Sequence, residues 1–319
     1  MERIHITDVS PRDGLQNQQA LLSTAVKVEL IRRLGAAGVR RVEATSFVSP
    51  RAVPQMADAA DVLAGIASLP GLQASVLVPN MKGLERARAA GAREIAVVLS
   101  ATDTMNQRNI GMGLDEATRV SEETLRAALA AGMAARAYVA VAVECPFEGL
   151  VDSARVVGLA ERMALAGAHE VVIADTIGAA APGQVKRLLR DLRDTLPLER
   201  TAVHLHDTRG LGSANAWAAL EAGVRRFDAS TGGVGGCPFA PGAAGNLATE
   251  DLVLMAQQSG FDTGIRLEGL AQTVAFMAQQ LGNTLGGRCM RWYENRAFQK
   301  GNSAESRARD VRATCENHS

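Results

Sequence analysis

Two histidines, His204 and His206, are separated by a single residue near the end of an apolar stretch of the sequence. On a β-strand, residues two positions apart project to the same face, so both imidazole rings could bind one metal ion. A pair of hydrogen-bonded histidines inside the core is the alternative. They are two of only five histidines in the chain, and their spacing alone leaves both interpretations open.

The tripeptide Arg12-Asp13-Gly14 follows the first apolar stretch. The carboxylate of Asp13 could supply a third metal ligand, and the guanidinium of Arg12 could bind an anion or an enolate. An Asp-Gly turn with a surface salt bridge is the alternative, because Asp and Gly are both common in turns.

A glycine-rich segment, residues 230–246, contains Cys237 and ends at Asn246. It lacks the G-x-x-x-x-G-K-[ST] pattern of a phosphate-binding loop. We interpret it as a lid, or as a loop that delivers Cys237 and Asn246 to a site. An inert, buried thiol is the alternative interpretation of Cys237.

Short apolar runs alternate with Ala-rich helical stretches, and these elements must position the polar residues. Five helical stretches end in Ala-Gly, where glycine can adopt the left-handed conformation that closes a helix; these glycines are Gly38, Gly91, Gly132, Gly167 and Gly223. The pattern predicts strands near residues 4–8, 41–44, 73–78, 94–99, 136–143, 171–174, 201–206 and 226–230. It predicts helices over residues 24–37, 56–66, 82–90, 114–131, 153–166, 182–194, 213–222, 249–259 and 267–281. This alternation favours a (β/α)8 TIM barrel of the α/β class with an extra C-terminal helix; an open doubly wound sheet is the alternative.

Polar residues gather at the predicted carboxyl ends of these strands. In a barrel, all of these ends meet at one face, where catalytic side chains lie. One buried carboxylate could be structural, but this concentration indicates a site. The residues are Arg12 and Asp13 after the first strand, then Glu43, Glu144, Asp175, His204, His206, Asp228 and Ser230.

The chain has 319 residues with 34 basic and 34 acidic side chains, a balance that argues against a nucleic-acid partner. No apolar run reaches the roughly 18 residues of a membrane span, and the first residues do not resemble a signal or transit peptide. The four cysteines include no C-x-x-C pair, which argues against a disulfide framework. We predict a cytoplasmic protein without a membrane partner, a barrel domain with its C-terminal helix over residues 1–285, and a polar tail over residues 286–319.

Seven stretches together resemble the hydroxymethylglutaryl-CoA lyase family, which belongs to a wider group of metal-dependent barrel lyases and acyl-CoA condensing synthases. The resemblance runs from about residue 4 to about residue 282, and the last stretch is the most specific. The matching stretches are PRDGLQNQ (11–18), VEATSFVSPRAVPQM (42–56), VPNMKGLERARAAGA (78–92), CPFEG (145–149), DTIGAAAPG (175–183), HLHDTRG (204–210) and GGCPFAPGAAGNLATEDLV (235–253).

The resemblance implies a divalent cation, Mg²⁺ or Mn²⁺, bound by Asp13, His204, His206 and Asn246. Two imidazoles and oxygen ligands, with positions left for substrate and water, suit either ion in octahedral geometry. The family's substrate is an acyl-CoA, and its barrels are often dimers or tetramers, so we expect a homo-oligomer.

The implied reaction is a retro-Claisen cleavage of 3-hydroxy-3-methylglutaryl-CoA to acetyl-CoA and acetoacetate, a step of leucine degradation. Arg12 would stabilise the enolate, Cys237 would protonate it as general acid, and Glu43 would lie near the metal and substrate. The candidate bases for the hydroxyl proton are Asp175 first, then His204 or Asp13. The side chains expected against the substrate are Arg12, Gln16, Arg136, Glu144 and Val172.

Some positions depart from the family pattern. Val172 stands where a serine is usual, and Ala174 and Glu144 stand where glycines are usual. A carboxylate at Glu144, at the predicted end of the fifth strand, should disfavour a dicarboxylic substrate unless it is paired, for example with Arg136. The alternatives are therefore the same chemistry on citramalyl-CoA or a longer-branched glutaryl-CoA, and after these a condensing synthase or a non-catalytic acyl-CoA binder.

Overall fold

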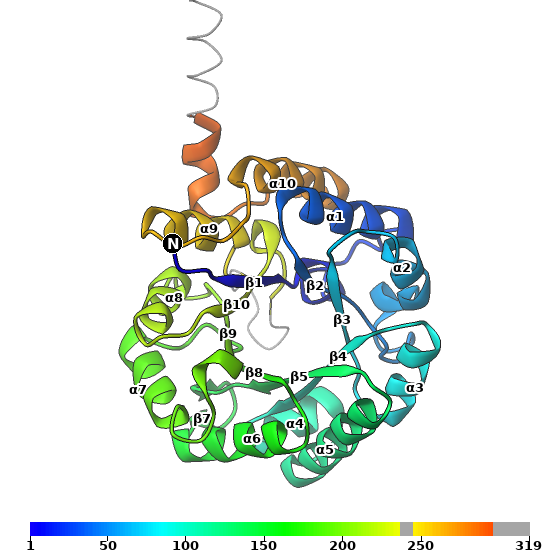
Figure 1. Cartoon of the computed structure of the whole chain (residues 1–319), viewed down its shortest axis with the longest axis vertical. Coiled ribbons are helices and arrows are strands. Elements are labelled where there is room, and N and C mark those ends of the chain that lie inside the picture. Colours follow the sequence, from blue (N-terminus) through cyan, green and yellow to red (C-terminus); the bar gives the residue numbers. More distant parts are fainter. Residues whose placement is uncertain (237–244, 296–319) are drawn as a thin grey trace, which may run out of the picture.

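The computed structural model describes residues 1–236 and 245–295 of the chain. Eight parallel strands close into a barrel in the spatial order β1-β10-β9-β8-β5-β4-β3-β2, and helices surround it (Figure 1). The first strand closes the barrel, because it pairs with β10 along its whole length and with β2 at Thr7 and Asp8. The barrel strands are β1 (His5–Asp8), β2 (Arg41–Ser46), β3 (Gln73–Leu77), β4 (Glu94–Ser100), β5 (Ala134–Ala140), β8 (Glu170–Asp175), β9 (Thr201–Leu205) and β10 (Arg226–Ala229). The predicted (β/α)8 barrel and its eight strands are confirmed.

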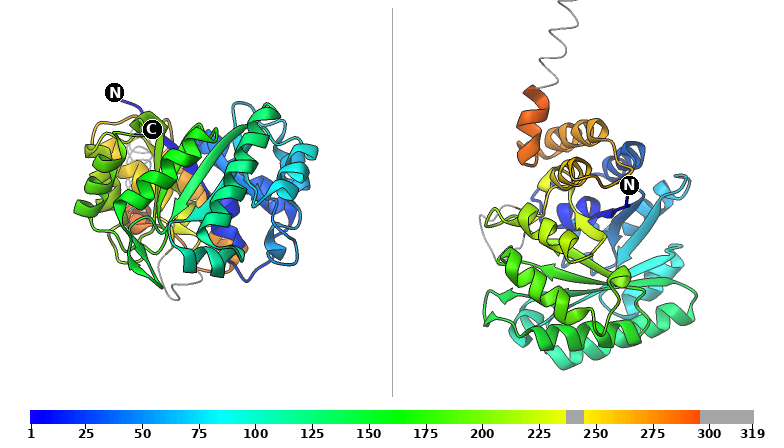
Figure 2. Two further views of the ribbon diagram at one scale, coloured as in Figure 1. Left: turned by 90° about the horizontal axis from the view of Figure 1, so that it is seen from below. Right: turned by 60° about the vertical axis from the view of Figure 1, so that its left-hand side comes forward.

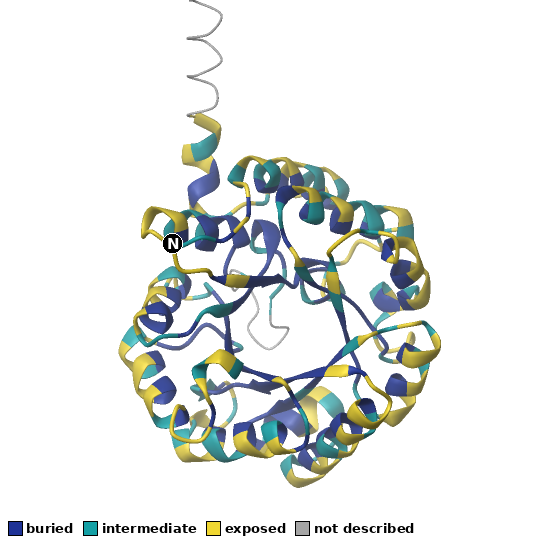
Figure 3. Ribbon diagram, viewed as in Figure 1, coloured by how far each residue is buried: buried dark blue, intermediate teal, exposed yellow. Residues whose placement is uncertain are grey.

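The helices lie outside the barrel and bury one face each, as α7 illustrates. Val185, Leu188, Leu189 and Leu192 are buried, at the three- and four-residue spacing that forms one helical stripe. Figure 3 shows buried strands inside and exposed outer helix faces. The helices are α1 (Thr24–Ala37), α2 (Ala59–Ile66), α3 (Met81–Ala89), α4 (Asp103–Ile110), α5 (Leu114–Ala130), α6 (Ser153–Leu165), α7 (Pro182–Leu192), α8 (Gly212–Glu221), α9 (Thr249–Gln258) and α10 (Leu267–Leu281).

Glycine ends the helices where the Ala-Gly pattern predicts. All five predicted glycines have positive φ angles, between +71° for Gly132 and +115° for Gly167. Glycine adopts this conformation without the steric penalty that a Cβ atom brings, so each helix can turn sharply toward the next strand.

Two features of the fold are absent from the sequence prediction. Helix α4 lies between β4 and α5, and a small hairpin, β6 (Glu144–Cys145) with β7 (Gly149–Leu150), follows β5. The fifth barrel strand ends at Ala140 and not at residue 143 as predicted, because Val141 has a φ of +50° that turns the chain out of the sheet. Glu144 therefore lies on the hairpin and not on a barrel strand.

The chain beyond α10 returns to the barrel before it projects from it. Asp251 accepts hydrogen bonds from the backbone of Arg288 (2.7 Å) and Cys289 (2.8 Å), and Cys289 and Met290 are buried. Residues 288–295 are helical and stand out beyond α9 and α10 (Figure 2). The predicted domain boundary at residue 285 thus falls just before a packed stretch. No helix among the described residues has the length and apolarity to cross a bilayer.

Candidate active site

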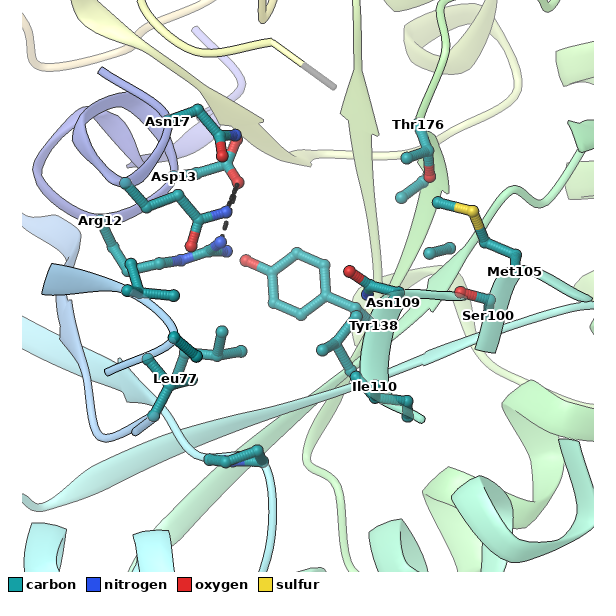
Figure 4. Close-up of a pocket in the computed structure, with 18 of the residues that line it drawn as sticks. Arg12, Asp13, Asn17, Leu77, Ser100, Met105, Asn109, Ile110, Tyr138 and Thr176 are labelled. Carbon is teal, nitrogen blue, oxygen red and sulfur yellow. Dashed lines mark hydrogen bonds and ion pairs between the residues drawn. The ribbon is translucent and has the colours of Figure 1, made fainter. Parts of the chain in front are cut away.

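A cavity of about 540 Å³ opens at the carboxyl ends of the barrel strands. Figure 4 shows Arg12 and Asp13 on one side of it and the phenol ring of Tyr138 at its centre. Apolar side chains such as Leu77 and Ile110 complete the wall. Its polar and ionisable lining residues are Arg12, Asp13, Gln16, Asn17, Ser49, Asn80, Ser100, Asn109, Tyr138, Thr176, His204 and His206.

The loop that carries Arg12 and Asp13 is anchored by a buried carboxylate at the end of β1. Asp8 accepts hydrogen bonds from the backbone N–H (2.9 Å) and hydroxyl (2.5 Å) of Ser10. Its other oxygen accepts from the hydroxyls of Thr231 (2.6 Å) and Thr249 (2.7 Å). Asp8 therefore ties the turn η1 (Ser10–Gly14) to the chain after β10 and to the start of α9.

Glu43 and Asp13 fix the guanidinium of Arg12. The Arg12 Nε atom donates to Glu43 Oε2 (2.6 Å), its Nη2 atom forms an ion pair with the same oxygen, and its Nη1 atom donates to Asp13 Oδ1 (2.8 Å). Glu43 is fully buried and does not line the cavity. Its place in the structure is therefore behind Arg12, where it orients a cation that faces the cavity.

Four candidate metal ligands converge beside Arg12. The Nε2 atoms of His204 and His206 lie 3.1 Å apart, and the ligand atoms of Asp13 and both histidines lie within 4.8 Å of one another. Two ligands bound about 2.1 Å from an ion at adjacent octahedral positions lie about 3.0 Å apart. The histidine spacing thus matches one shared cation.

Asn246 completes this cluster through the orientation of its amide. Its Nδ2 atom donates to Asp13 Oδ2 (2.8 Å) and to the Val234 carbonyl (3.1 Å). The Oδ1 atom is buried and has no hydrogen-bond partner among the described residues. A buried carbonyl oxygen without a partner is costly unless it binds something, so this atom fits a cation ligand.

The protonation states of Asp13 and His206 also suit a cation. Burial, with the neighbouring His204, lowers the pKa of His206 to about 3, so this ring is neutral at pH 7 and offers a lone pair. Burial alone would raise the pKa of Asp13, but Arg12 and the two histidines lower it below its ordinary value. The result is one carboxylate and one neutral imidazole aimed at the same point.

Gly235 allows the loop after β10 to reach the cluster. A Cβ atom at this position would lie 2.6 Å from Asn246 Nδ2, and the φ angle of +108° also favours glycine. The close approach lets Asn246 reach Asp13. Cys237, the predicted general acid, lies outside the described residues, but the preceding Gly236 lines the cavity.

Two predicted site residues, Gln16 and Asp175, differ in whether they line the cavity. Gln16 lines the cavity, and its Nε2 atom lies 3.4 Å from Asp13 Oδ1. Asp175 does not line it; its carboxylate accepts from the backbone of Ala179 (2.9 Å) and Ala180 (3.1 Å) in the turn after β8.

The other three predicted substrate contacts also lie elsewhere. Arg136 and Val172 are fully buried within the barrel, below the cavity. Glu144 is half-buried and accepts a hydrogen bond from Arg209 (3.0 Å), so the suggested partner Arg136 is wrong. Glu144 lies away from the cavity wall, and its ion pair with Arg209 balances its charge there.

Tyr138, Asp8 and Asp228 are site residues that sequence reasoning missed or left without a role. Asp8 is the last residue of β1 and Asp228 is the last but one of β10, and a carboxylate at such a position is the signal that could have singled them out. Tyr138 lies in an apolar stretch and carries no such signal, because its neighbours are defined only by closure of the barrel.

Comparison with known proteins decides the family. A family model described as HMGL-like matches residues 3–277 of the chain. The chain belongs to the HMGL-like family. Among relatives of this HMGL-like protein, the mitochondrial hydroxymethylglutaryl-CoA lyase of Bos taurus is 45% identical over 280 residues, which cover 88% of this chain and 86% of the relative. The hydroxymethylglutaryl-CoA lyase of Pseudomonas mevalonii is 43% identical over 282 residues, which cover 88% and 94%.

Solved structures agree with the HMGL-like assignment. The HMG-CoA lyase of Brucella melitensis superposes with a TM-score of 0.86 at 43% identity, covering 89% of this chain and all of that one. The HMG-CoA lyase of Acinetobacter baumannii, in complex with coenzyme A and 3-methylmalate, gives 0.86 at 39% identity, covering 91% and 94%. The resemblance seen in the sequence is confirmed.

Proposed function

We propose that this protein is a divalent-cation-dependent carbon–carbon lyase that cleaves 3-hydroxy-3-methylglutaryl-CoA to acetyl-CoA and acetoacetate. The observation that carries the proposal is that Arg12, Asp13 and the two histidines line one cavity, with the histidine Nε2 atoms 3.1 Å apart. The names of the HMGL-like relatives support the same substrate. We extend the acyl-CoA class to this chain on the coenzyme A complex of one relative.

Asp13, His204, His206 and Asn246 would hold Mg²⁺ or Mn²⁺, because oxygen ligands combined with two imidazoles suit these ions. When bound, the cation supplies chelation of the substrate and makes its tertiary hydroxyl more acidic. The fit rests on the unpartnered Oδ1 atom of Asn246 and on the neutral ring of His206.

Arg12 would stabilise the enolate that forms when the C–C bond breaks. Its guanidinium faces the cavity in an orientation set by Glu43 and Asp13, so it can donate to the enolate oxygen without reorganising. The thiol of Cys237 would then donate its proton to the enolate carbon, which gives the methyl group of acetyl-CoA. Gly236, the residue before Cys237 in the sequence, lines the cavity, which supports this assignment.

The base that removes the hydroxyl proton stays a prediction. Asp175 is the first candidate from the sequence, yet both of its oxygens accept backbone hydrogen bonds. This geometry favours Asp175 as the residue that shapes the turn after β8, with His204 or Asp13 as the alternative bases. The homo-oligomer and the cytoplasmic location also stay predictions.

Glu144 and Val172 depart from the family pattern, but their positions in the structure give little reason to expect a different substrate. Neither side chain lines the cavity, and Arg209 balances the charge of Glu144. We therefore propose 3-hydroxy-3-methylglutaryl-CoA ahead of citramalyl-CoA.

The test is a product assay on the purified protein with Mg²⁺, with each thioester offered separately. We expect acetoacetate from 3-hydroxy-3-methylglutaryl-CoA. Pyruvate from citramalyl-CoA without acetoacetate would overturn the proposed substrate and keep the mechanism. Two variants separate the machinery: Cys237→Ala should spare cation binding and abolish most turnover, whereas His206→Ala should weaken cation binding sharply.

A further inference from the structure

A buried carboxylate lies on the far side of His204 from the cavity. Asp228, the last residue but one of β10, is 1% exposed, and its Oδ2 atom lies 3.5 Å from His204 Nδ1. Among the described residues, neither Nδ1 atom has a hydrogen-bond partner in the strict sense, but His204 Nδ1 has a carboxylate within ion-pair distance and His206 Nδ1 has none. The two candidate histidine ligands therefore differ in what stands behind the ring.

We propose that Asp228 is a positioning residue for the candidate metal ligand His204: it holds the Nδ1–H tautomer and turns Nε2 toward the cation. The inference rests on the proposed function, since it needs a cation held by the cluster. A neutral imidazole carries one proton, so a proton kept on Nδ1 leaves the lone pair on Nε2. The Nε2 atom is the one that faces His206 Nε2, at 3.1 Å.

Asp228 is itself held in place by two side chains from β5. Tyr138 donates its hydroxyl to Asp228 Oδ2 (2.6 Å), and Arg136 Nη2 donates to Oδ1 (2.6 Å). Arg136 also donates from Nη1 to the Tyr138 hydroxyl (3.1 Å) and from Nε to Glu170 (2.5 Å). These bonds fix both oxygens of Asp228, so it is placed to orient His204 and not to bind the cation.

The alternative is that Asp228 serves only the buried charge network. In that case its sole task is to balance Arg136, and it would have no influence on the cluster. Glu170 separates the two possibilities, because it pairs with the same Arg136 but lies away from His204 and also contacts Arg41 and Arg226. Glu170→Gln is thus a control that removes a carboxylate from the network without touching the histidine.

The experiment measures Mn²⁺ affinity of the full-length protein by titration calorimetry, without substrate. Asp228→Asn keeps the shape of the side chain, but its amide can donate to Nδ1 and favour the wrong tautomer, as happens when the orienting carboxylate of a catalytic histidine is replaced. Loss of such a partner typically costs about 10- to 100-fold in metal affinity. We expect that loss for Asp228→Asn and no comparable loss for Glu170→Gln.

Tyr138→Phe gives a second measurement if Asp228→Asn does not fold. It removes one hydrogen bond from Asp228 and keeps the carboxylate, so we expect a smaller but measurable weakening of Mn²⁺ binding. Folded Asp228→Asn or Tyr138→Phe protein with wild-type Mn²⁺ affinity would overturn the positioning role alone. Wild-type protein that bound neither Mn²⁺ nor Mg²⁺ would overturn the proposed cation-dependent function as well, so the two failures are distinguishable.

Discussion

The proposed chemistry depends most on Arg12, and the contacts of its guanidinium indicate which substitutions would test its role. Its three nitrogens contact Glu43 and Asp13, so the guanidinium is fixed before any substrate arrives. Preorganised donors of this kind act on charge that develops during the reaction, which is why their loss lowers turnover more than binding.

We expect Arg12→Gln to lower kcat about 10²- to 10³-fold while Mn²⁺ affinity changes far less, because the enolate loses its cation and the four ligands stay. Steady-state kinetics and calorimetry on one preparation measure both quantities. Glu43→Gln is the matched control, since it weakens the support of Arg12 and keeps the arginine; its kcat should fall less. Near-wild-type turnover in Arg12→Gln would contradict the role of the guanidinium.

The loops after the strands carry the site, and the contacts of two of these loops each lead to a prediction. In the turn after β8, Asp175 holds the backbone of Ala179 and Ala180. We expect Asp175→Asn to cost about 1–3 kcal/mol of stability, since one buried N–H loses its acceptor. The acid limb of the pH–rate profile should keep its position. If that limb disappears and turnover falls about 10²- to 10⁴-fold, Asp175 is the base.

At the loop after β10, Gly235 meets Asn246 closely. We expect Gly235→Ala to weaken Mn²⁺ binding, because the new Cβ atom would displace the amide that lies 2.6 Å away. Gly91→Ala is the matched control: its φ of +82° brings a similar backbone strain of about 1–2 kcal/mol, but nothing lies within 4 Å of its Cβ position. Equal Mn²⁺ affinities in the two variants would contradict the steric argument.

These loops also mark the limit of sequence-based prediction. The strands could be predicted because they are apolar on both faces and follow Ala-Gly helix ends. Glu144 was misplaced because nothing in the sequence indicates that Val141 adopts a positive φ. The contacts of Asp8 with Thr231 and Thr249 span more than 200 residues, and only closure of the barrel brings them together.

For the whole molecule, the chain after α10 is held to the barrel by acidic residues at the start of α9. Glu250 is fully buried and accepts hydrogen bonds from the backbone of Gly287 (2.7 Å) and Gly232 (3.0 Å). One side chain thus connects the C-terminal segment to the turn η4 (Thr231–Gly233), which follows β10 and precedes the loop of the candidate site. The stability of the entire fold should depend on its protonation.

Burial raises the pKa of Glu250 from 4.5 to about 7, and the two backbone donors only partly oppose it. A carboxyl group with a raised pKa binds its proton more tightly when folded, so its contribution to stability is full below about pH 4.5 and is lost as the pH rises to about 7. At 1.36 kcal/mol per pH unit, this loss amounts to about 3 kcal/mol.

The variant Glu250→Gln has no carboxyl group to titrate at this position. Between pH 5 and pH 8, denaturant unfolding should therefore show the stability of the variant rising relative to the wild type by about 2.5 kcal/mol, because part of the contribution is already lost at pH 5. Glu268 is exposed, so Glu268→Gln is the control, and its stability relative to the wild type should be the same at the two pH values. For Glu250→Gln, an equal stability difference from the wild type at both pH values would show that Glu250 stays ionised in the folded protein.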